Sequence, residues 1–183
     1  RGLRVTLFEM RPQRMTEAHH GSDCAELVCS NSFKSTNLAN AHGLLKAELS
    51  AQGSLMMQGA ARHSVPAGQA LAVDRAAFSR WVTEALEAEP NITLLREEVR
   101  DPQSLLAQHR AVILASGPLT SPALSEALGQ WIAQDTLYFY DAIAPMVSAD
   151  SIDLGIAFAA SRYDKGGADY LNLPLSAAEY HAF

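Results

Sequence analysis

Residues 3–9, Leu-Arg-Val-Thr-Leu-Phe-Glu, constrain the fold of this chain more than any other stretch. Apolar and polar side chains alternate at first, which predicts a β-strand, and Pro12 prevents its regular continuation. A strand that ends on an acidic residue is typical of dinucleotide-binding α/β units, in which the acid accepts hydrogen bonds from ribose hydroxyls. An ordinary edge strand with Glu9 in solvent explains the same residues, and both readings stay open at this point.

The glycine-rich turn of such a unit lies about 20 residues before the acid. Only eight residues precede Glu9, and they contain no Gly-x-Gly-x-x-Gly pattern. If Glu9 has the ribose-binding role, we therefore expect the phosphate-binding turn to lie before residue 1.

A second feature is the apolar run at residues 111–115, which continues into Ser116-Gly117-Pro118. The run predicts a buried parallel strand, and small residues after it allow the backbone to approach a cofactor closely. The segment is similar to the Ala-Thr-Gly signature of FAD proteins, with Ser116 in place of Thr. Together with Glu9 it favours FAD binding.

The remaining pattern predicts alternating helices and strands. Asp74 is expected to cap a helix that Pro90 ends, and Ser176 to cap the last helix. The other predicted elements are a helix over residues 37–52, an extended segment within 54–70 with a turn at 66–68, a strand at 91–97, a short helix at 122–129, and a β-hairpin formed by 156–163 and 169–173. Residues 13–35 are predicted to be a loop.

Composition excludes several classes of protein. The net charge of −6 argues against a surface that binds nucleic acid throughout, although it allows a local basic patch. No apolar run is long enough for a membrane span, and the start is not a signal peptide. Two cysteines are too few for a secreted disulfide framework, which favours a reducing cytoplasm. The His19-His20 pair lacks a third ligand at helical spacing, so we expect no metal site.

Cys29 precedes Ser30-Asn31-Ser32 and is a candidate nucleophile. Backbone N–H groups of this polar turn, or a nearby cation such as Lys34 or His20, would stabilise a thiolate. Two alternatives stay open, namely an inert buried cysteine and a disulfide with Cys24.

Ordered strings along nearly the whole chain carry a family resemblance. They lie at residues 8–12, 18–20, 25–32, 64–68, 70–75, 116–122, 137–142, 161–166 and 170–172. The series resembles the folate- and FAD-dependent tRNA uracil-5-methyltransferases (TrmFO), which are relatives of the MnmG tRNA-modifying flavoproteins.

The resemblance implies transfer of a methylene group from methylenetetrahydrofolate to C5 of a uridine in the tRNA T-loop. Reduced FAD, regenerated by NAD(P)H, would convert the methylene to a methyl group. The uridine lies inside the folded tRNA and must be exposed to reach the flavin. By the same match Cys29 is the catalytic thiol, because attack by a thiolate at C6 activates C5. The residues expected along FAD are Glu9, Arg11, Ser30, Asn31, Val99, Ala115, Ser116 and Gly117.

The implied architecture is α/β, with a partial Rossmann-like FAD-binding domain of the GR2 type at residues 1–136. The start of a smaller inserted α+β domain would follow at 137–183. The isolated chain is expected to be colourless, because the phosphate-binding turn at the first helix N-terminus would lie before residue 1. It is also expected to be inactive, and a second catalytic cysteine of the family would lie beyond Phe183. The oligomeric state is left open. The alternatives are a MnmG-like or other FAD oxidoreductase, which the Cys-Ser-Asn-Ser context disfavours, and a non-catalytic remnant.

Overall fold

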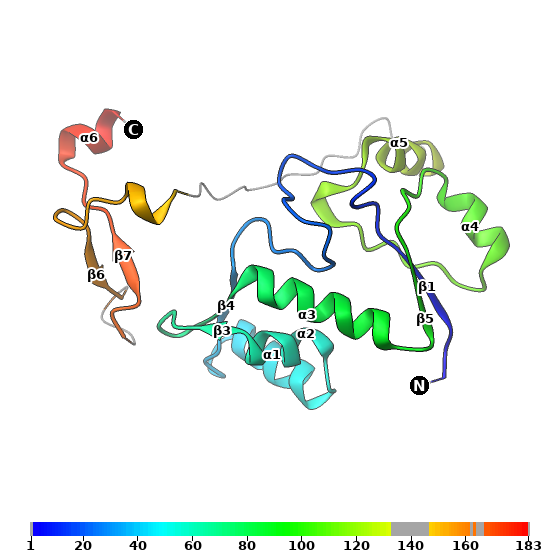
Figure 1. Cartoon of the computed structure of the whole chain (residues 1–183), viewed down its shortest axis with the longest axis horizontal. Helices are drawn as coiled ribbons and strands as arrows, with labels where there is room; N and C mark the ends of the chain where they lie inside the picture. The colour runs from blue at the N-terminus through cyan, green and yellow to red at the C-terminus, as the bar shows by residue number, and fades with distance from the viewer. Residues whose placement is uncertain (1, 133–146, 162, 164–166, 183) are drawn as a thin grey trace. The chain divides into compact units, whose positions relative to one another are not determined.

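The structure is a computed structural model that describes residues 2–132, 147–161, 163 and 167–182. The chain divides into two compact units (Figure 1). The first comprises Arg1–Cys29 with Ser79–Ile143, and the second Ser30–Phe78 with Ala144–Phe183. The predicted domain boundary between residues 136 and 137 lies outside the described residues and stays a prediction.

A two-stranded parallel sheet forms the centre of the first unit. Strand β1 (Val5–Phe8) pairs with β5 (Ile92–Leu95), with Val5 opposite Ile92 and Phe8 opposite Leu95. The N–H of Glu9 extends the ladder by donating to the carbonyl of Leu95 at 2.9 Å. Both strands were predicted, and their parallel pairing brings the residues after each strand to the same edge of the sheet.

Helix α3 (Arg75–Ala88) begins where the sequence predicts it. Its cap is Asp74, whose Oδ1 accepts a hydrogen bond from the N–H of Ala77 at 3.0 Å. In the first unit the helix buries Val82 and Thr83, which are 3% and 5% exposed. The Thr83 hydroxyl accepts a hydrogen bond from the N–H of Cys24 at 2.8 Å and donates to the carbonyl of Ser79, so the loop after β1 is fixed to this helix.

Two further helices complete the first unit, α4 (Pro102–Gln108) and α5 (Pro122–Trp131), separated by a short 3₁₀ turn, Gly117–Leu119. Sequence reasoning missed α4. The strand predicted at residues 111–115 is wrong for this structure, because the segment pairs with no other strand among the described residues. Ile113 is consequently 89% exposed. A strand needs a neighbour that completes its backbone hydrogen bonds, and sequence periodicity does not reveal whether one is present.

The second unit is built around a three-stranded antiparallel sheet in the order β2-β4-β3. Its strands are β2 (Ser32–Ser35), β3 (Ser64–Val65) and β4 (Ala70–Val73), and the predicted turn at 66–68 joins β3 to β4. Val73 and Phe78 are fully buried, and the ring of Phe33 meets that of Phe78 edge-on at 5.5 Å between centroids. Burial of a side chain of this size stabilises the fold by roughly 1.5–3 kcal/mol. Strand β2 lies inside the segment that was predicted to be a loop.

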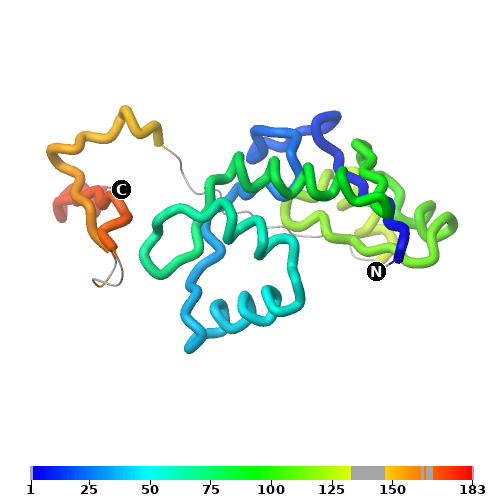
Figure 2. The backbone as a smooth tube through the Cα atoms, turned by 60° about the horizontal axis from the view of Figure 1, so that its bottom comes forward, coloured from blue at the N-terminus to red at the C-terminus, as the bar shows by residue number. Residues whose placement is uncertain are grey.

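Helices α1 (Ala41–Ala51) and α2 (Leu55–Arg62) follow one another with a tight turn between them (Figure 2). Helix α1 starts later than predicted because the Asn40 side chain accepts a hydrogen bond from the N–H of Gly43 and caps it. The prediction of an extended segment over α2 is wrong. Met57 and Ala60, three residues apart, are both buried on one helical face, a spacing that a strand cannot use.

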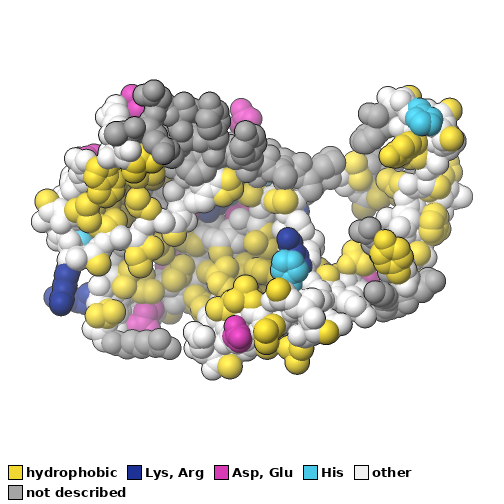
Figure 3. Space-filling view, turned by 180° about the vertical axis from the view of Figure 1, so that it is seen from behind, with side chains coloured by type: hydrophobic (Ala, Val, Ile, Leu, Met, Phe, Trp, Pro, Cys, Tyr) yellow, Lys and Arg dark blue, Asp and Glu magenta, His cyan; other side chains and the backbone are white. Residues whose placement is uncertain are grey.

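The described C-terminal residues form the predicted hairpin of β6 (Phe158–Ala160) and β7 (Tyr170–Asn172), preceded by a 3₁₀ turn, Ala149–Ser151, and followed by α6 (Ala177–Ala182). The Tyr170 hydroxyl donates to the carbonyl of Ala67 at 2.6 Å, which ties the hairpin to the β3–β4 turn. Apolar side chains such as Phe158 and Leu171 are about half exposed, and yellow side chains are visible on the surface in Figure 3. The strings at 137–142 and most of 161–166 lie outside the described residues.

Candidate functional site

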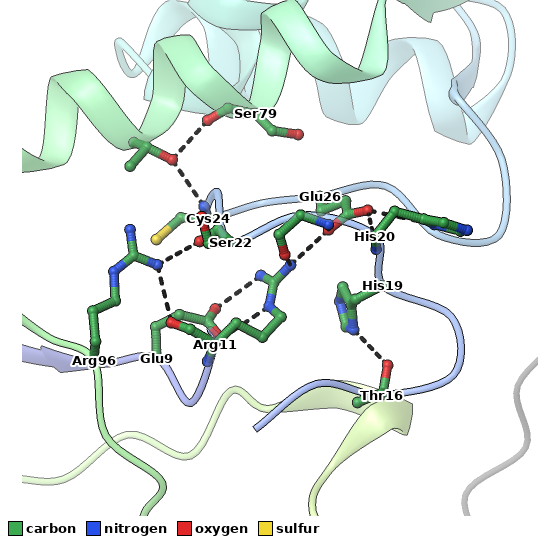
Figure 4. Close-up of polar contacts among 12 residues, drawn as sticks. Glu9, Arg11, Thr16, His19, His20, Ser22, Cys24, Glu26, Ser79 and Arg96 are labelled. Carbon is green, nitrogen blue, oxygen red and sulfur yellow. Dashed lines mark hydrogen bonds and ion pairs between the residues drawn. The ribbon is translucent and has the colours of Figure 1, made fainter. Parts of the chain in front are cut away.

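Glu9 follows β1 directly, and its carboxylate is held by Arg11 (Figure 4). The backbone N–H and Nε of Arg11 both donate to Glu9 Oε1 at 3.0 Å, and Arg11 Nη2 donates to Oε2 at 3.0 Å. A carboxylate offers about four lone-pair sites, so these three bonds leave one acceptor position, on Oε2. Burial opposes the charged carboxylate, but the hydrogen bonds and charge of Arg11 outweigh it and hold the pKa of Glu9 below its ordinary value.

Arg11 is itself buried, with 3% of its surface exposed, and bonds a second acid from the following loop. Its Nη1 donates to Glu26 Oε2 at 2.8 Å and to the carbonyl of Gly21 at 3.2 Å. Desolvation lowers the pKa of Arg11, but the hydrogen bonds and charge of Glu9, with the charge of Glu26, raise it above the ordinary value. The guanidinium is therefore a permanent cation between two carboxylates.

Arg96, which follows β5, fastens the same loop from the other strand. Its Nη1 donates to the carbonyl of Ser22 at 2.5 Å and to that of Arg11 at 3.4 Å. The loop thus contacts the ends of both strands. Burial raises the pKa of the Cys24 thiol within this loop, a result that disfavours the reactive thiolate form of Cys24.

A cavity of about 550 Å³ lies at the carboxyl ends of β1 and β5. The cavity is lined by Val99 together with Phe8, Gln13, Arg14, Glu97, Glu98, Arg100, Asp101, Ser104 and Leu105. This volume is within the range of small-molecule sites. The carboxylate of Glu98 is buried, and its Oε1 forms no hydrogen bond to the described residues, although Arg14 Nε lies 3.4 Å away as an ion-pair partner. A hydrogen bond from Ser121 lowers the pKa of Glu98, and Arg100 and Arg14 lower it further against the effect of burial.

Cys29 is an exposed free thiol at the entrance to β2, whereas Cys24 is a buried free thiol. The predicted alternatives of a buried Cys29 and of a Cys24–Cys29 disulfide are therefore wrong. The residues that follow are locally fixed. The Ser30 hydroxyl accepts from the N–H of Ser32 at 3.0 Å, and Asn31 exchanges hydrogen bonds with the backbone of Val73.

The Ala115-Ser116-Gly117 segment forms an exposed turn. Gly117 has a φ of +68° and open space where a Cβ would lie. The hydroxyls of Ser116 and Thr120 are 2.7 Å apart, and Thr120 also donates to the carbonyl of Gly117. The positive φ explains the glycine at this position.

The structure therefore brings Glu9 and Arg11 into one cluster, and it places Val99 at the cavity wall. Sequence reasoning missed Glu26, Arg96 and Glu98. Each has at least one partner far along the chain, namely Arg11, Ser22 and Arg14 respectively. Among residues 2–132 and the described C-terminal stretches, no group of three or more His, Cys, Asp or Glu side chains is arranged to hold a metal ion. None of the helices there combines the length and apolarity that a bilayer span requires.

Comparison with known proteins identifies relatives over the whole chain. Relatives from Geobacter sulfurreducens, Heliobacterium modesticaldum and Aquifex aeolicus are 58%, 56% and 51% identical, and each alignment covers all of this chain. All three bear the name methylenetetrahydrofolate–tRNA-(uracil-5-)-methyltransferase TrmFO. The chain spans only 40–41% of their lengths. The profile of the glucose inhibited division protein A family, GIDA, matches residues 1–183. The chain belongs to this family, whose FAD-binding domain is Rossmann-like.

Proposed function

We propose that the protein is a methylenetetrahydrofolate- and FAD-dependent tRNA (uracil-5-)-methyltransferase that forms 5-methyluridine in the tRNA T-loop. The observation that carries the proposal is Cys29, an exposed free thiol in a chain whose full length aligns with relatives of that name. The exposed Cys29 also favours this reading over an inert core cysteine, because a thiol that attacks a base must be accessible.

Cys29 supplies the nucleophile. Its thiolate adds to C6 of uracil, and the electron pair of the C5–C6 double bond moves into an enolate, which makes C5 nucleophilic. C5 then bonds to the methylene carbon of the folate, and one of the two carbon–nitrogen bonds of that methylene breaks, its electron pair passing to the folate nitrogen. After the C5 proton is lost, the second carbon–nitrogen bond breaks and releases the folate, a hydride that reduced FAD would supply completes the methyl group, and departure of the thiolate from C6 restores the C5–C6 double bond. Cys24 is unsuited to this task, because it is buried and its pKa is raised.

The cavity at the ends of β1 and β5 fits the adenosine half of FAD, because Phe8, Val99 and Leu105 provide apolar surface. In addition, the buried Glu98 Oε1 accepts no hydrogen bond from any residue that the structure describes. Glu9 has one acceptor position for a ribose hydroxyl, with Arg11 beside it. The other residues assigned to the cofactor are Ser30, Asn31, Ala115, Ser116 and Gly117. When bound, reduced FAD supplies the electrons that convert the methylene to a methyl group.

The remaining partners follow from the same assignment. They are tRNA, methylenetetrahydrofolate and, as the reductant of the flavin, NAD(P)H. The proposed location is the cytoplasm, where both cysteines stay reduced.

A methyl-transfer assay tests this function. The full-length gene product is incubated with FAD, NADPH, methylenetetrahydrofolate and a tRNA transcript, and 5-methyluridine is measured by mass spectrometry of the T-loop fragment. We expect methylation by the wild type, and its loss in Cys29→Ala with unchanged FAD content. Undiminished methylation by Cys29→Ala would reject Cys29 as the catalytic thiol, and no methylation by the wild type would reject the activity.

A further inference from the structure

We infer that Arg11 and Glu26 are positioning residues for the cofactor, which act on the ribose through Glu9 rather than by direct contact. The inference rests on the proposed FAD function and adds Glu26, a residue from a loop outside the dinucleotide-binding pattern. It also assigns Arg11 a different role from the one that the family resemblance implies.

Most of the hydrogen-bond donors of the Arg11 side chain are occupied within the chain. Four of its five guanidinium N–H groups are accounted for by the carboxylates of Glu9 and Glu26 and the carbonyl of Gly21. Its side chain is 4% exposed, so almost none of it is available to a ligand. A side chain in this state influences a ligand only through the groups that it holds.

Arg11 fixes both the position and the rotation of the Glu9 carboxylate. Its Nε and Nη2 bond the two carboxylate oxygens separately, which is the bidentate geometry that defines the plane of the carboxylate. The plane of the carboxylate is fixed, and Oε1 already accepts two hydrogen bonds. The direction of the remaining acceptor position on Oε2 is therefore fixed as well. The Glu9 side chain is 20% exposed, so this oxygen can still reach a ligand.

Glu26 holds the guanidinium of Arg11 from the side opposite Glu9. Its Oε2 accepts from Arg11 Nη1 at 2.8 Å and from the N–H of Gly21 at 3.1 Å, while Oε1 accepts from the N–H of His20 at 2.9 Å. Within the part of the chain that the structure describes, each of these hydrogen-bond partners of Glu26 is a donor. In Figure 4 Arg11 lies between Glu9 and Glu26, so the loop acid sets where the guanidinium sits.

Glu26→Gln is therefore a disruptive change despite its small size. Whichever oxygen becomes an amide nitrogen brings donor against donor, either at His20 or at Gly21 and Arg11. Arg11→Lys keeps the charge but loses the fork, so it cannot fix the plane of the Glu9 carboxylate. Both variants leave Glu9 itself in place.

The experiment compares the Kd of FAD with that of an FAD analogue lacking the 2′-hydroxyl of its adenosine ribose, in the full-length gene product. A hydrogen bond to a charged acceptor predicts that the wild type prefers FAD by about tenfold or more. We expect this preference to fall to about twofold or less in Glu26→Gln and in Arg11→Lys, because a loosely held carboxylate gains little from the hydroxyl. Glu17→Gln, an exposed acid in the same loop, is the matched control and should keep the wild-type ratio.

The ratio of the two Kd values separates a positioning role from general destabilisation of the protein, because destabilisation weakens the binding of both ligands equally. Arg11→Lys provides the test if Glu26→Gln does not fold. If a folded variant prefers FAD over the analogue as strongly as the wild type does, the inference is overturned, whereas the proposed FAD site is left intact. A wild type that binds FAD and its analogue equally would overturn the ribose assignment of Glu9 and the inference with it.

Discussion

Removal of the Arg11 guanidinium is the perturbation with the most specific structural consequence. Arg11→Ala leaves two carboxylates, Glu9 and Glu26, with 20% and 16% of their side chains exposed, and deprives the carbonyl of Gly21 of a donor. Loss of one partner of a buried ion pair costs about 3–5 kcal/mol. Because water still reaches both carboxylates, we expect the lower end, about 3 kcal/mol, or roughly two orders of magnitude in the folding equilibrium.

Urea unfolding of the chain, followed by tryptophan fluorescence, measures this cost. Trp81 and Trp131 are the two tryptophans of the chain, and both lie in the same unit as the cluster, so their emission reports on it. The exposed Arg80 provides the control, since Arg80→Ala should change stability by no more than about 0.5 kcal/mol. A loss below about 1 kcal/mol in Arg11→Ala would refute the view that the cluster depends on this cation.

Three further outcomes follow from named residues. Because the pKa of Glu9 is lowered, its ionised carboxylate stabilises the fold at pH values above the ordinary pKa of 4.5, and this contribution disappears as the pH falls through the lowered pKa. In urea titrations the free energy of unfolding should therefore decrease less steeply with falling pH in Glu9→Gln than in the wild type. A Cβ at Gly43 would lie 2.0 Å from the carbonyl oxygen of Asn37. Gly43→Ala should therefore lower the free energy of unfolding by about 1–3 kcal/mol despite the helix preference of alanine, and the thermal unfolding temperature should fall with it. Iodoacetamide should label exposed Cys29 before buried Cys24 in a mass-spectrometric time course, and the reverse order would contradict the structure.

Local patterns predicted much of the fold. The alternation before Glu9 and the run at residues 91–97 predicted two strands, which the structure confirms, whereas their parallel pairing with each other was not predicted. Caps were equally readable, because Asp74 and Ser176 satisfy helix N–H groups only three residues away. The C-terminal hairpin followed from two apolar runs around a glycine-containing turn.

Features that depend on distant neighbours were not predictable. Glu26 is fifteen residues from Arg11, and their contact depends on the path of an irregular loop that periodicity does not describe. The run at residues 111–115 has the composition of a buried strand, yet no strand among the described residues pairs with it. The two adjacent methionines of α2 give no clear apolar period in the sequence. The helical face becomes evident only in the folded unit, where Met57 and Ala60 are both buried.

A covalent trap tests directly whether Cys29 attacks the uracil base. The full-length gene product is incubated with its cosubstrates and a tRNA whose T-loop uridine is replaced by 5-fluorouridine, because fluorine at C5 replaces the proton that must leave before the thiolate can depart. We expect a stable adduct that peptide mass spectrometry locates on Cys29. An adduct on a different residue, or methylation of normal tRNA without any trapped adduct at Cys29, would contradict it.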